Sequence, residues 1–377
     1  MFLLEQSWFF MRFFYRLFGL FPLERVEEAD LKPTSACRFW IRYIITSTLV
    51  MSIFVGPICY ATNFKDYALA FVAVIGISVY DMMSVAATFI VQFGLHVKCL
   101  SMIRSFGKRF SDLQHFVNAK ITMEPNDMSG NRLKFYSYVL PNFIFSISFT
   151  ILNPLGWNYS LKSKLNLSDL ETNLITISFI IFNTVALNPL YYLLTLYIEV
   201  TIKLMLYCKF LIKRSSSPMI LEEANTFITI LKEFASMFSS LLRWIISLNF
   251  LFAIIIGFLL YIKGTMAISS VDLNWYDYFP IIAMVFMMAY LISLFYTLCT
   301  LSEKIANNVQ DLKLEISKRC YQQEKADHIL RELDDFKGFD ADGYFTVNHS
   351  LLTGMTTNFA TFLVILIQFK QAESPSV

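Results

Sequence analysis

The side chains whose types and spacing most clearly indicate a function lie in the last hydrophobic stretch of the chain, residues 343–369. A helix through this stretch turns ~100° per residue, and it gathers polar side chains into one stripe roughly 80° wide. The stripe consists of Thr353, Thr357, Thr361, Val364 and Gln368. Hydroxyl and amide groups on an otherwise apolar helix need water or another polar helix beside them. The stripe can therefore line a pore, or it can pack against another helix, which is the commoner use of Thr in membranes.

A candidate gate lies near the end of the same stretch. Ile365, Gln368 and Phe369 are spaced i, i+3 and i+4, so they share one face of a helix. Copies of Ile365 and Phe369 around a symmetry axis would form an apolar constriction that blocks ions by dewetting. Thr361 and Phe362 lie one turn below and complete the set of candidate pore and gate residues.

A second group of residues could bind a small organic molecule. Asp81 stands alone in an apolar stretch, where a carboxylate is costly and should face a cavity, a ligand or a hydrogen-bonding neighbour. Aromatic side chains crowd the outer halves of several predicted spans, as in mostly apolar ligand pockets, although an interfacial belt or ordinary core explains each one singly. The candidate pocket residues are Tyr80, Asp81, Phe149, Trp157, Phe179, Phe252, Tyr261, Phe286 and Tyr290, with Phe145 beside them.

The sequence carries no motif for catalysis or metal binding. It has no nucleophile elbow, no HExxH and no phosphate loop, and its four histidines are scattered. The six cysteines include no close CxxC pair, and we expect no structural disulfide. A net charge of +2 gives no indication of a nucleic-acid partner. We therefore expect no enzyme activity, no cofactor, no metal site and no nucleic-acid partner.

The composition predicts an all-α membrane protein with several spans. The chain has 377 residues, of which 56% are hydrophobic and 16% charged. A soluble domain would carry about a quarter charged residues. Seven apolar stretches reach the ~20 residues that a transmembrane helix needs. They lie near residues 40–60, 67–95, 135–155, 174–202, 238–262, 278–301 and 351–369.

The distribution of Lys and Arg predicts the orientation in the membrane. Both residues are frequent before the first span and in the loops after the second, fourth and sixth spans, and they are sparse in the other loops. The positive-inside rule then places the N-terminus in the cytoplasm and the C-terminus outside the cell. Two sequons, at Asn158 and Asn166, fall in a loop that this orientation puts outside, so both are glycosylation candidates. A third, at Asn348, falls on the cytoplasmic side and should be silent.

The sixth helix is expected to continue beyond its span into water. Apolar residues recur there at helical spacing, at Ile305, Val309, Leu312 and Ile316. Such a stripe must be buried, either against the fourth and fifth helices or against a neighbouring subunit. Glu199 and Arg243 lie at similar depth in the fourth and fifth spans, and we expect them to pair as a structural clamp.

These patterns divide the chain into five regions. They are a cytoplasmic N-terminal segment (residues 1–39), a six-helix ligand-binding transmembrane bundle (40–301), a cytoplasmic helical anchor (302–342), a pore-lining seventh helix (343–369) and an extracellular tail (370–377).

Both ends of the chain resemble a known family. Residues 361–369 read Thr-Phe, five aliphatic residues, then Gln-Phe. This is similar to the C-terminal signature of insect gustatory receptors, which reads Thr-Tyr, five hydrophobic residues, Gln-Phe. Phe362 stands where Tyr is usual, which removes any hydrogen bond that the Tyr hydroxyl would make. Near the other end, Gly19-Leu20-Phe21-Pro22 resembles the short motif before the first span in that family.

The resemblance implies a tetramer, either homomeric or formed with related receptors, in which the last helices surround a central cation pore. It also implies a cytoplasmic anchor built from the inner ends of the fourth to seventh helices, one outward-opening ligand pocket per subunit, and a place in the plasma membrane of sensory neurons. The resemblance further implies a tastant-gated, non-selective cation channel. The aromatic, sparsely polar candidate pocket favours bitter or aversive compounds as its ligands. A sugar- or pheromone-sensing member of the family is an alternative, as is a seven-span receptor or transporter without a pore of its own.

Overall fold

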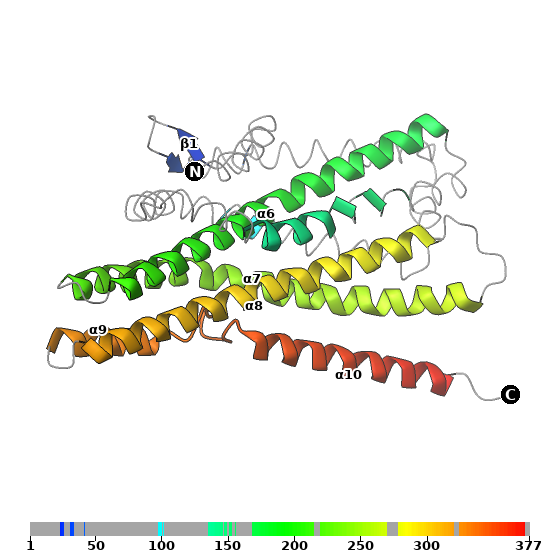
Figure 1. The fold of residues 1–377 in the computed structure, drawn as a ribbon. Coiled ribbons are helices and arrows are strands. Elements are labelled where there is room, and N and C mark those ends of the chain that lie inside the picture. Colours follow the sequence, from blue (N-terminus) through cyan, green and yellow to red (C-terminus); the bar gives the residue numbers. More distant parts are fainter. Residues whose placement is uncertain are drawn as a thin grey trace.

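Long helices lying side by side dominate the computed structural model (Figure 1). The structure describes residues 23–25, 31–33, 41, 97–99, 101, 135–145, 147–148, 151–152, 155, 168–214, 219–269, 278–319 and 324–373. The named helices are α6 (Asp169–Lys213), α7 (Ile220–Ser269), α8 (Tyr278–Arg319), α9 (Glu324–Asp335) and α10 (His349–Glu373). A short antiparallel pair, β1 (Leu23–Arg25) and β2 (Leu31–Pro33), aligns Leu23 with Pro33 and was not expected from the sequence.

Three of the helices are much longer than a membrane is thick. α6, α7 and α8 contain 45, 50 and 42 residues. At ~1.5 Å per residue each is at least twice as long as the ~30 Å hydrocarbon core. This confirms that the sixth predicted helix continues past its span. Within the described residues, the segments Ile220–Ile262 of α7 and Ile281–Lys318 of α8 are long and apolar enough to cross a membrane.

The fifth helix begins earlier than its hydropathy indicated. α7 starts at Ile220, whereas the predicted span started at residue 238. The added turns carry Glu222, Glu223 and Lys232. These charges lower the mean hydropathy and concealed an amphipathic segment that is helical because it buries Phe227, Leu231 and Phe234.

Helices α7 and α8 form the centre of the described bundle, because each packs against the other and against α6, α9 and α10. The predicted apolar stripe of α8, Ile305, Val309, Leu312 and Ile316, is fully buried inside the chain. Burial of the stripe against the chain's own helices is therefore confirmed. The Cys208 thiol of α6 donates a hydrogen bond to the Asn308 carbonyl of α8 over 3.1 Å. Burial raises the pKa of Cys208 to about 12, so the thiol stays protonated as a donor.

Helix α9 is a short amphipathic helix held against α7 and α8. Its buried side is formed by Ala326, Ile329 and Leu333. Ion pairs flank this apolar contact: Lys232 of α7 meets Glu332, and Lys313 of α8 lies 2.5 Å from Asp334.

The chain between α9 and α10 folds into a tight, hairpin-like loop. Ala341 N–H donates to the Phe345 carbonyl at 2.9 Å, and Val347 N–H donates to the Phe339 carbonyl at 2.8 Å. The turn requires positive φ at Gly338 (112°), Asp342 (52°) and Gly343 (75°). Glycine adopts this conformation without steric cost, which explains its presence at two of the three positions.

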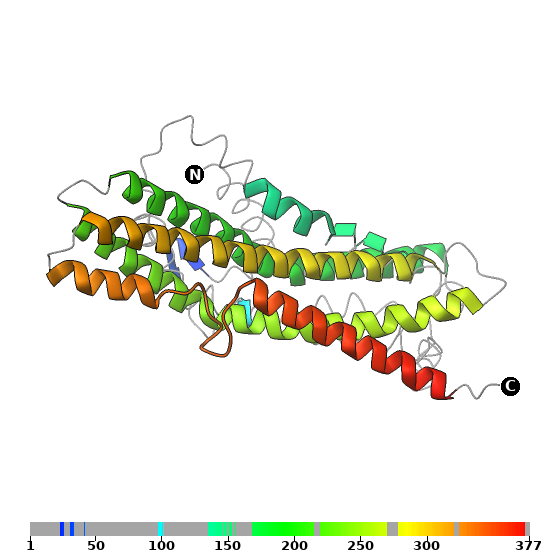
Figure 2. The same ribbon diagram turned by 60° about the horizontal axis from the view of Figure 1, so that its bottom comes forward.

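An aromatic cluster fastens this loop to the bundle. The fully buried Phe339 ring lies 5.4 Å from the rings of both Tyr197 in α6 and Phe234 in α7. Phe238 packs on Phe234 at 4.7 Å. We call residues 302–348, as far as they are described, the junction region; Figure 2 shows its loop joining α9 to the start of α10.

Candidate functional site

Helix α10 has two opposite faces. Leu352, Met355 and Phe359 lie on one side and are partly buried against the bundle. At ~100° per residue, the polar stripe from Thr353 to Gln368 lies about 180° away from them. The side of α10 that packs against the bundle and the side that carries the polar stripe are therefore opposite each other.

The whole polar stripe is exposed in the single chain. Thr353, Thr357, Thr361 and Gln368 are exposed, and so is Val364 at 52%. Each threonine hydroxyl donates to the backbone carbonyl one turn earlier, at 3.0, 3.0 and 2.9 Å along the chain. The hydrogen of each of these hydroxyls is thus already bonded within α10, and it needs no acceptor from a second helix. Packing against another helix of the same chain does not account for the stripe within the described residues.

Three of the candidate pore and gate residues lie on the part of α10 that the rest of the chain leaves uncovered. Ile365 is 43% exposed, Thr361 and Gln368 are exposed, and Phe362 is partly buried. The side chain of Phe369 lies outside the described residues. A gate formed by copies of these residues stays a prediction.

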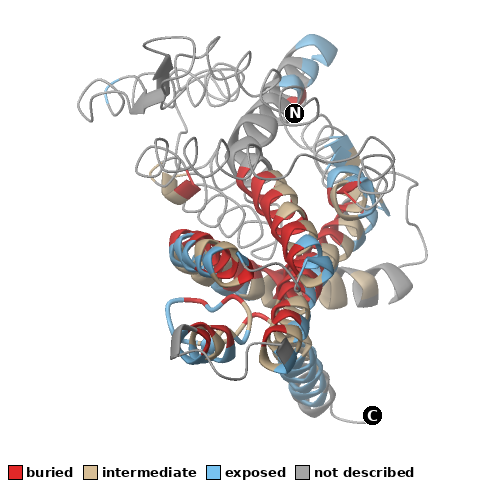
Figure 3. Cartoon of the chain, turned by 60° about the vertical axis from the view of Figure 1, so that its left-hand side comes forward, coloured by how far each residue is buried: buried red, intermediate tan, exposed pale blue. Residues whose placement is uncertain are grey.

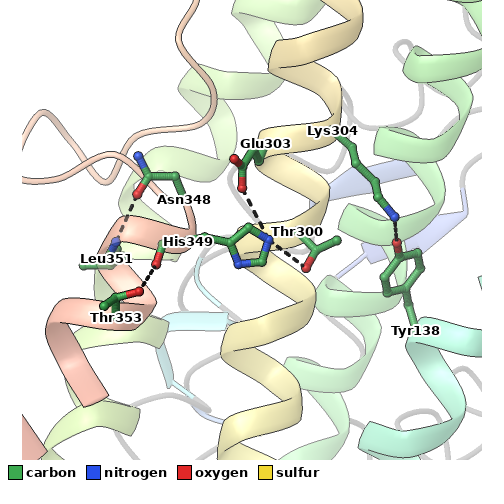
Figure 4. A network of polar contacts seen from close by, with 8 residues as sticks. All are labelled: Tyr138, Thr300, Glu303, Lys304, Asn348, His349, Leu351 and Thr353. Carbon is green, nitrogen blue, oxygen red and sulfur yellow. Dashed lines mark hydrogen bonds and ion pairs between the residues drawn. The ribbon is translucent and has the colours of Figure 1, made fainter. Parts of the chain in front are cut away.

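The first turn of α10 is fixed to α8 by polar contacts (Figure 4). Asn348 caps the helix, because its side-chain oxygen accepts the Leu351 N–H at 3.0 Å. The Nε2 atom of His349 lies 3.3 Å from a Glu303 carboxylate oxygen and 3.5 Å from the Thr300 hydroxyl. α10 is therefore held firmly at its beginning, although sequence reasoning gave His349 no role.

Other polar contacts attach the helix of residues 135–145 to α8. The Lys304 ammonium donates to the Tyr138 hydroxyl at 2.6 Å, as Figure 4 shows. The buried Asn142 amide donates to Thr297 at 3.2 Å. Asn142 carried a signal for this contact, since an amide in an apolar span usually bonds to another helix.

The expected pairing of Glu199 with Arg243 is wrong. Glu199 pairs with Lys203, one turn along α6, at 2.6 Å. Arg243 instead reaches Asp342 of the loop at 3.2 Å, and its guanidinium lies 5.2 Å from the Tyr344 ring centre. A local i,i+4 partner is always within reach on a helix, whereas the return of the loop to α7 is invisible in the spacing of charges.

Some candidate pocket residues lie in the described part of the chain. Phe252 and Tyr290 are fully buried, and Tyr261 and Phe286 are half-buried. The structure brings Phe145 and Phe286 together, with ring centres 6.3 Å apart. Tyr80, Asp81, Phe149, Trp157 and the sequons at Asn158 and Asn166 lie outside the described residues, as does the side chain of Phe179.

No metal site occurs in the part of the chain that the structure describes, as judged by groups of three or more His, Cys, Asp or Glu side chains. The described cysteines, Cys99, Cys208 and Cys299, are buried free thiols. Burial also raises the pKa of Cys99 to about 12, which keeps this thiol protonated and unreactive.

Comparison with known proteins gives consistent results. The sequence model of the family described as 7tm chemosensory receptors matches residues 9–373. No curated protein matches the chain. The insect olfactory receptor OR5 from Machilis hrabei in complex with eugenol has a similar structure, with a TM-score of 0.67, 13% identity, and coverage of 97% of this chain and 98% of that one. A second structure of that receptor matches with a TM-score of 0.65, 15% identity and the same coverage. At such identities the likeness is one of fold.

Proposed function

This chain belongs to the 7tm chemosensory receptor family, and from that membership we propose that it is a gustatory receptor acting as a tastant-gated, non-selective cation channel. The family makes it a membrane protein with the fold of the insect seven-transmembrane receptors. Taste as the sense, the pore and the plasma membrane of a sensory neuron belong to the proposal.

The observation that carries the proposal is the uncovered polar stripe of α10. The exposed Gln368 amide is costly in contact with lipid, and the outward oxygen lone pairs of Thr353, Thr357 and Thr361 gain from contact with water. The stripe as a whole therefore favours an aqueous surface. Copies of α10 around a symmetry axis would turn their stripes toward a common water-filled channel. A tetramer, homomeric or formed with related receptors, satisfies this need.

In this assembly the end of α10 is the gate. Rings of Ile365 and Phe369 form an apolar constriction, and Gln368 either bonds to its neighbours when closed or faces the lumen when open. Residues 302–342 then serve as the cytoplasmic anchor, with residues 1–39 inside the cell and residues 370–377 outside.

The ligand is a small, mostly apolar tastant. The buried Phe252 and Tyr290 and the paired Phe145 and Phe286 supply aromatic surface, which suits aromatic or otherwise apolar compounds better than sugars. The related olfactory receptor binds eugenol, an aromatic compound of this kind. Bitter or aversive tastants are therefore the proposed class.

Ion currents test the proposal directly. The purified protein in planar bilayers should conduct cations when an active tastant is added, with eugenol as the first probe and a panel of bitter compounds next. Phe369→Ala should raise the ligand-independent current, and Gln368→Ala should change conductance or ion preference while ligand binding survives. Ligand binding without any current would favour a receptor without a pore. Gate variants that conduct like wild type would place the gate elsewhere.

The orientation of the chain in the membrane can be tested separately. An epitope tag at the C-terminus should be reached by antibody on intact cells, and a tag at the N-terminus only after permeabilisation. The reverse pattern would overturn the proposed topology.

A further inference from the structure

One contact between α10 and α7 leaves no space for a Cβ atom on the glycine that makes it. A Cβ atom built on the buried Gly257 of α7 would lie 2.4 Å from Cζ and 2.6 Å from Cε2 of Phe359 in α10. The Phe359 ring therefore occupies the space that any other residue at position 257 would fill. Any larger residue at position 257 would therefore require the Phe359 ring, or α10 with it, to shift.

We propose that Gly257 and Phe359 form the positioning contact that sets the distance of α10 from the bundle and, through it, the width of the pore. The inference rests on the proposed channel function. It assigns a role to two residues that sequence reasoning did not single out, and neither of them belongs to the stripe or to the candidate gate.

The place of Phe359 along α10 makes it effective as a support. The beginning of α10 is held beside α8 by His349, whose Nε2 atom contacts Glu303 and Thr300. Phe359 lies ten residues beyond His349, and Gln368 lies nineteen residues beyond it. If α10 tilts about its fixed first turn, a displacement at Phe359 is roughly doubled at Gln368, because the rise per residue is constant.

A Cβ atom at position 257 must displace the Phe359 ring, the helix that carries it, or both. A phenylalanine in a helix is restricted to two χ1 rotamers, both of which point the side chain back along its own face. On the α7 side, the residues near Gly257 in the sequence include Phe252, Ile256 and Leu259, which are all buried. The interior around them is closely packed. A change of volume at this contact is therefore transmitted to α10.

The contact also lies beside candidate ligand residues. Phe252 and Tyr261 are about one turn before and one turn after Gly257 in α7. A ligand that shifts either side chain acts on α7 at the level where Phe359 rests. This gives a short mechanical route from the proposed pocket to the proposed pore helix.

The direction of the effect follows from the two faces of α10. Phe359 lies on the side facing the bundle, and the stripe lies about 180° away, toward the proposed pore axis. A methyl group at position 257 pushes α10 toward the axis and narrows the pore. A smaller side chain at position 359 lets α10 approach α7 and widens it.

The test is a size exchange with matched controls. Wild type, Gly257→Ala, Phe359→Leu and the double variant are expressed in cells, and ligand-free and eugenol-evoked currents are each divided by surface-labelled protein. Gly264→Ala is the control on the same helix, because a Cβ at Gly264 meets no described atom within 4 Å. Melting temperatures of the purified proteins are measured in parallel.

We expect Gly257→Ala to lower the current per surface channel at least about fivefold, as for an overpacked core position. Phe359→Leu should raise the ligand-free current, and the double variant should return to within about twofold of wild type, since the two changes act on one contact. Gly264→Ala should behave as wild type. Melting temperature should fall for Gly257→Ala and recover in the double variant.

Different results would contradict the positioning role and the channel function. A Gly257→Ala channel that conducts like wild type, or a double variant as defective as Gly257→Ala alone, overturns the positioning role. A wild type that conducts neither without ligand nor with eugenol or any compound of the bitter panel overturns the proposed channel function and the pore-width role with it. In that case the melting temperatures of Gly257→Ala and of the double variant still show whether residues 257 and 359 are in contact.

Discussion

The junction region and helix α10 follow one another in the chain but differ in how their side chains are covered. In the junction region the apolar stripe of α8, the inner side of α9 and Phe339 are buried within the chain, and the ion pairs from Lys232 and Lys313 hold α9 in place. In α10 the packed side is narrow, and most of the helix surface is exposed. Figure 3 shows the contrast between a buried interior and a largely exposed C-terminal helix.

This difference distinguishes a region that is stabilised within one chain from a helix whose surface is left for water, lipid or other subunits. The apolar side chains of the junction region are covered by α6 and α7 of the same chain, so no second subunit is needed to bury them. α10 is fixed at its first turn and at Phe359, and its remaining surface awaits water, lipid or other subunits. Substitutions in the junction region should therefore affect folding, whereas substitutions on the stripe of α10 should affect assembly and conduction.

The largest expected effect comes from a charge in the stripe of α8. Leu312→Asp would place a carboxylate at a fully buried position, which costs more than about 4 kcal/mol and should abolish folded protein. Leu314→Asp is the matched control, because Leu314 is 55% exposed on the same helix. Surface expression and size-exclusion profiles measure both. A folded Leu312→Asp protein would contradict the buried stripe, and a folded Leu314→Asp monomer would place Leu314 at a subunit interface.

Removing the ring that fastens the loop should have the next largest effect. Phe339→Ala opens a cavity among Tyr197 and Phe234 and should destabilise the protein by about 3–5 kcal/mol. Thermal unfolding of purified protein measures the loss. Tyr344→Ala in the same loop removes a 72% exposed ring and should cost about 1 kcal/mol or less. Equal losses for the two variants would mean that the loop is not fastened through Phe339.

The two glycines of the loop offer a finer comparison. Gly338→Ala forces a non-glycine residue to a φ of 112°, and its Cβ would lie 3.0 Å from the Ser302 hydroxyl oxygen that accepts the Phe339 N–H. We expect a loss of about 1–3 kcal/mol. Gly343→Ala has a φ of 75° and open space around its Cβ, so its cost should stay near 1–2 kcal/mol. Melting temperatures that fall in the opposite order would show that steric contact at Gly338 is unimportant.

Acid should weaken the contact between α8 and α9. The hydrogen bond from Lys313 lowers the pKa of Asp334 below its ordinary value of 3.8. A carboxyl whose folded pKa is lowered contributes stability above its unfolded pKa, and that contribution is lost as the pH falls through the folded value. The melting temperature of wild type should therefore approach that of Asp334→Asn at acidic pH and exceed it slightly near neutral pH. A constant difference from pH 7 to strongly acidic solution would exclude this titration.

The smallest effect on stability should come from the stripe of α10. Thr357→Val keeps the shape of the side chain and removes an exposed hydroxyl, so stability should change by less than about 0.5 kcal/mol. Conductance per channel should nevertheless fall, because the proposed pore loses a ring of hydroxyls. Single-channel recording measures this. Unchanged conductance with unchanged stability would mean that the stripe faces no pore.

The elements with strong periodicity were predictable from the sequence. The continuation of α8, the burial of its stripe at Ile305 and Ile316, and a final helix near residues 351–369 all follow from apolar spacing, and the structure confirms them. Family membership was likewise carried by residues 361–369 at the C-terminal end. These signals are local, so one sequence suffices to detect them.

Contacts between distant parts of the chain were not predictable in the same way. The approach of Phe339 to Tyr197 and of Asp342 to Arg243 depends on the path of a loop with three positive φ angles. Gly338 and Gly343 marked a turn but not its direction. Gly257 stood in an ordinary apolar helix, and only the structure shows that Phe359 needs its missing side chain.

The back-bonded threonines of α10 have one more consequence. Thr353, Thr357 and Thr361 each direct their hydroxyl hydrogen to their own helix, so what they present outward is oxygen lone pairs. A channel lined in this way would carry a weakly negative electrostatic potential without a single ionised group. It should admit cations in preference to anions, discriminate little between sodium and potassium, and keep that preference across the pH range in which carboxylates titrate.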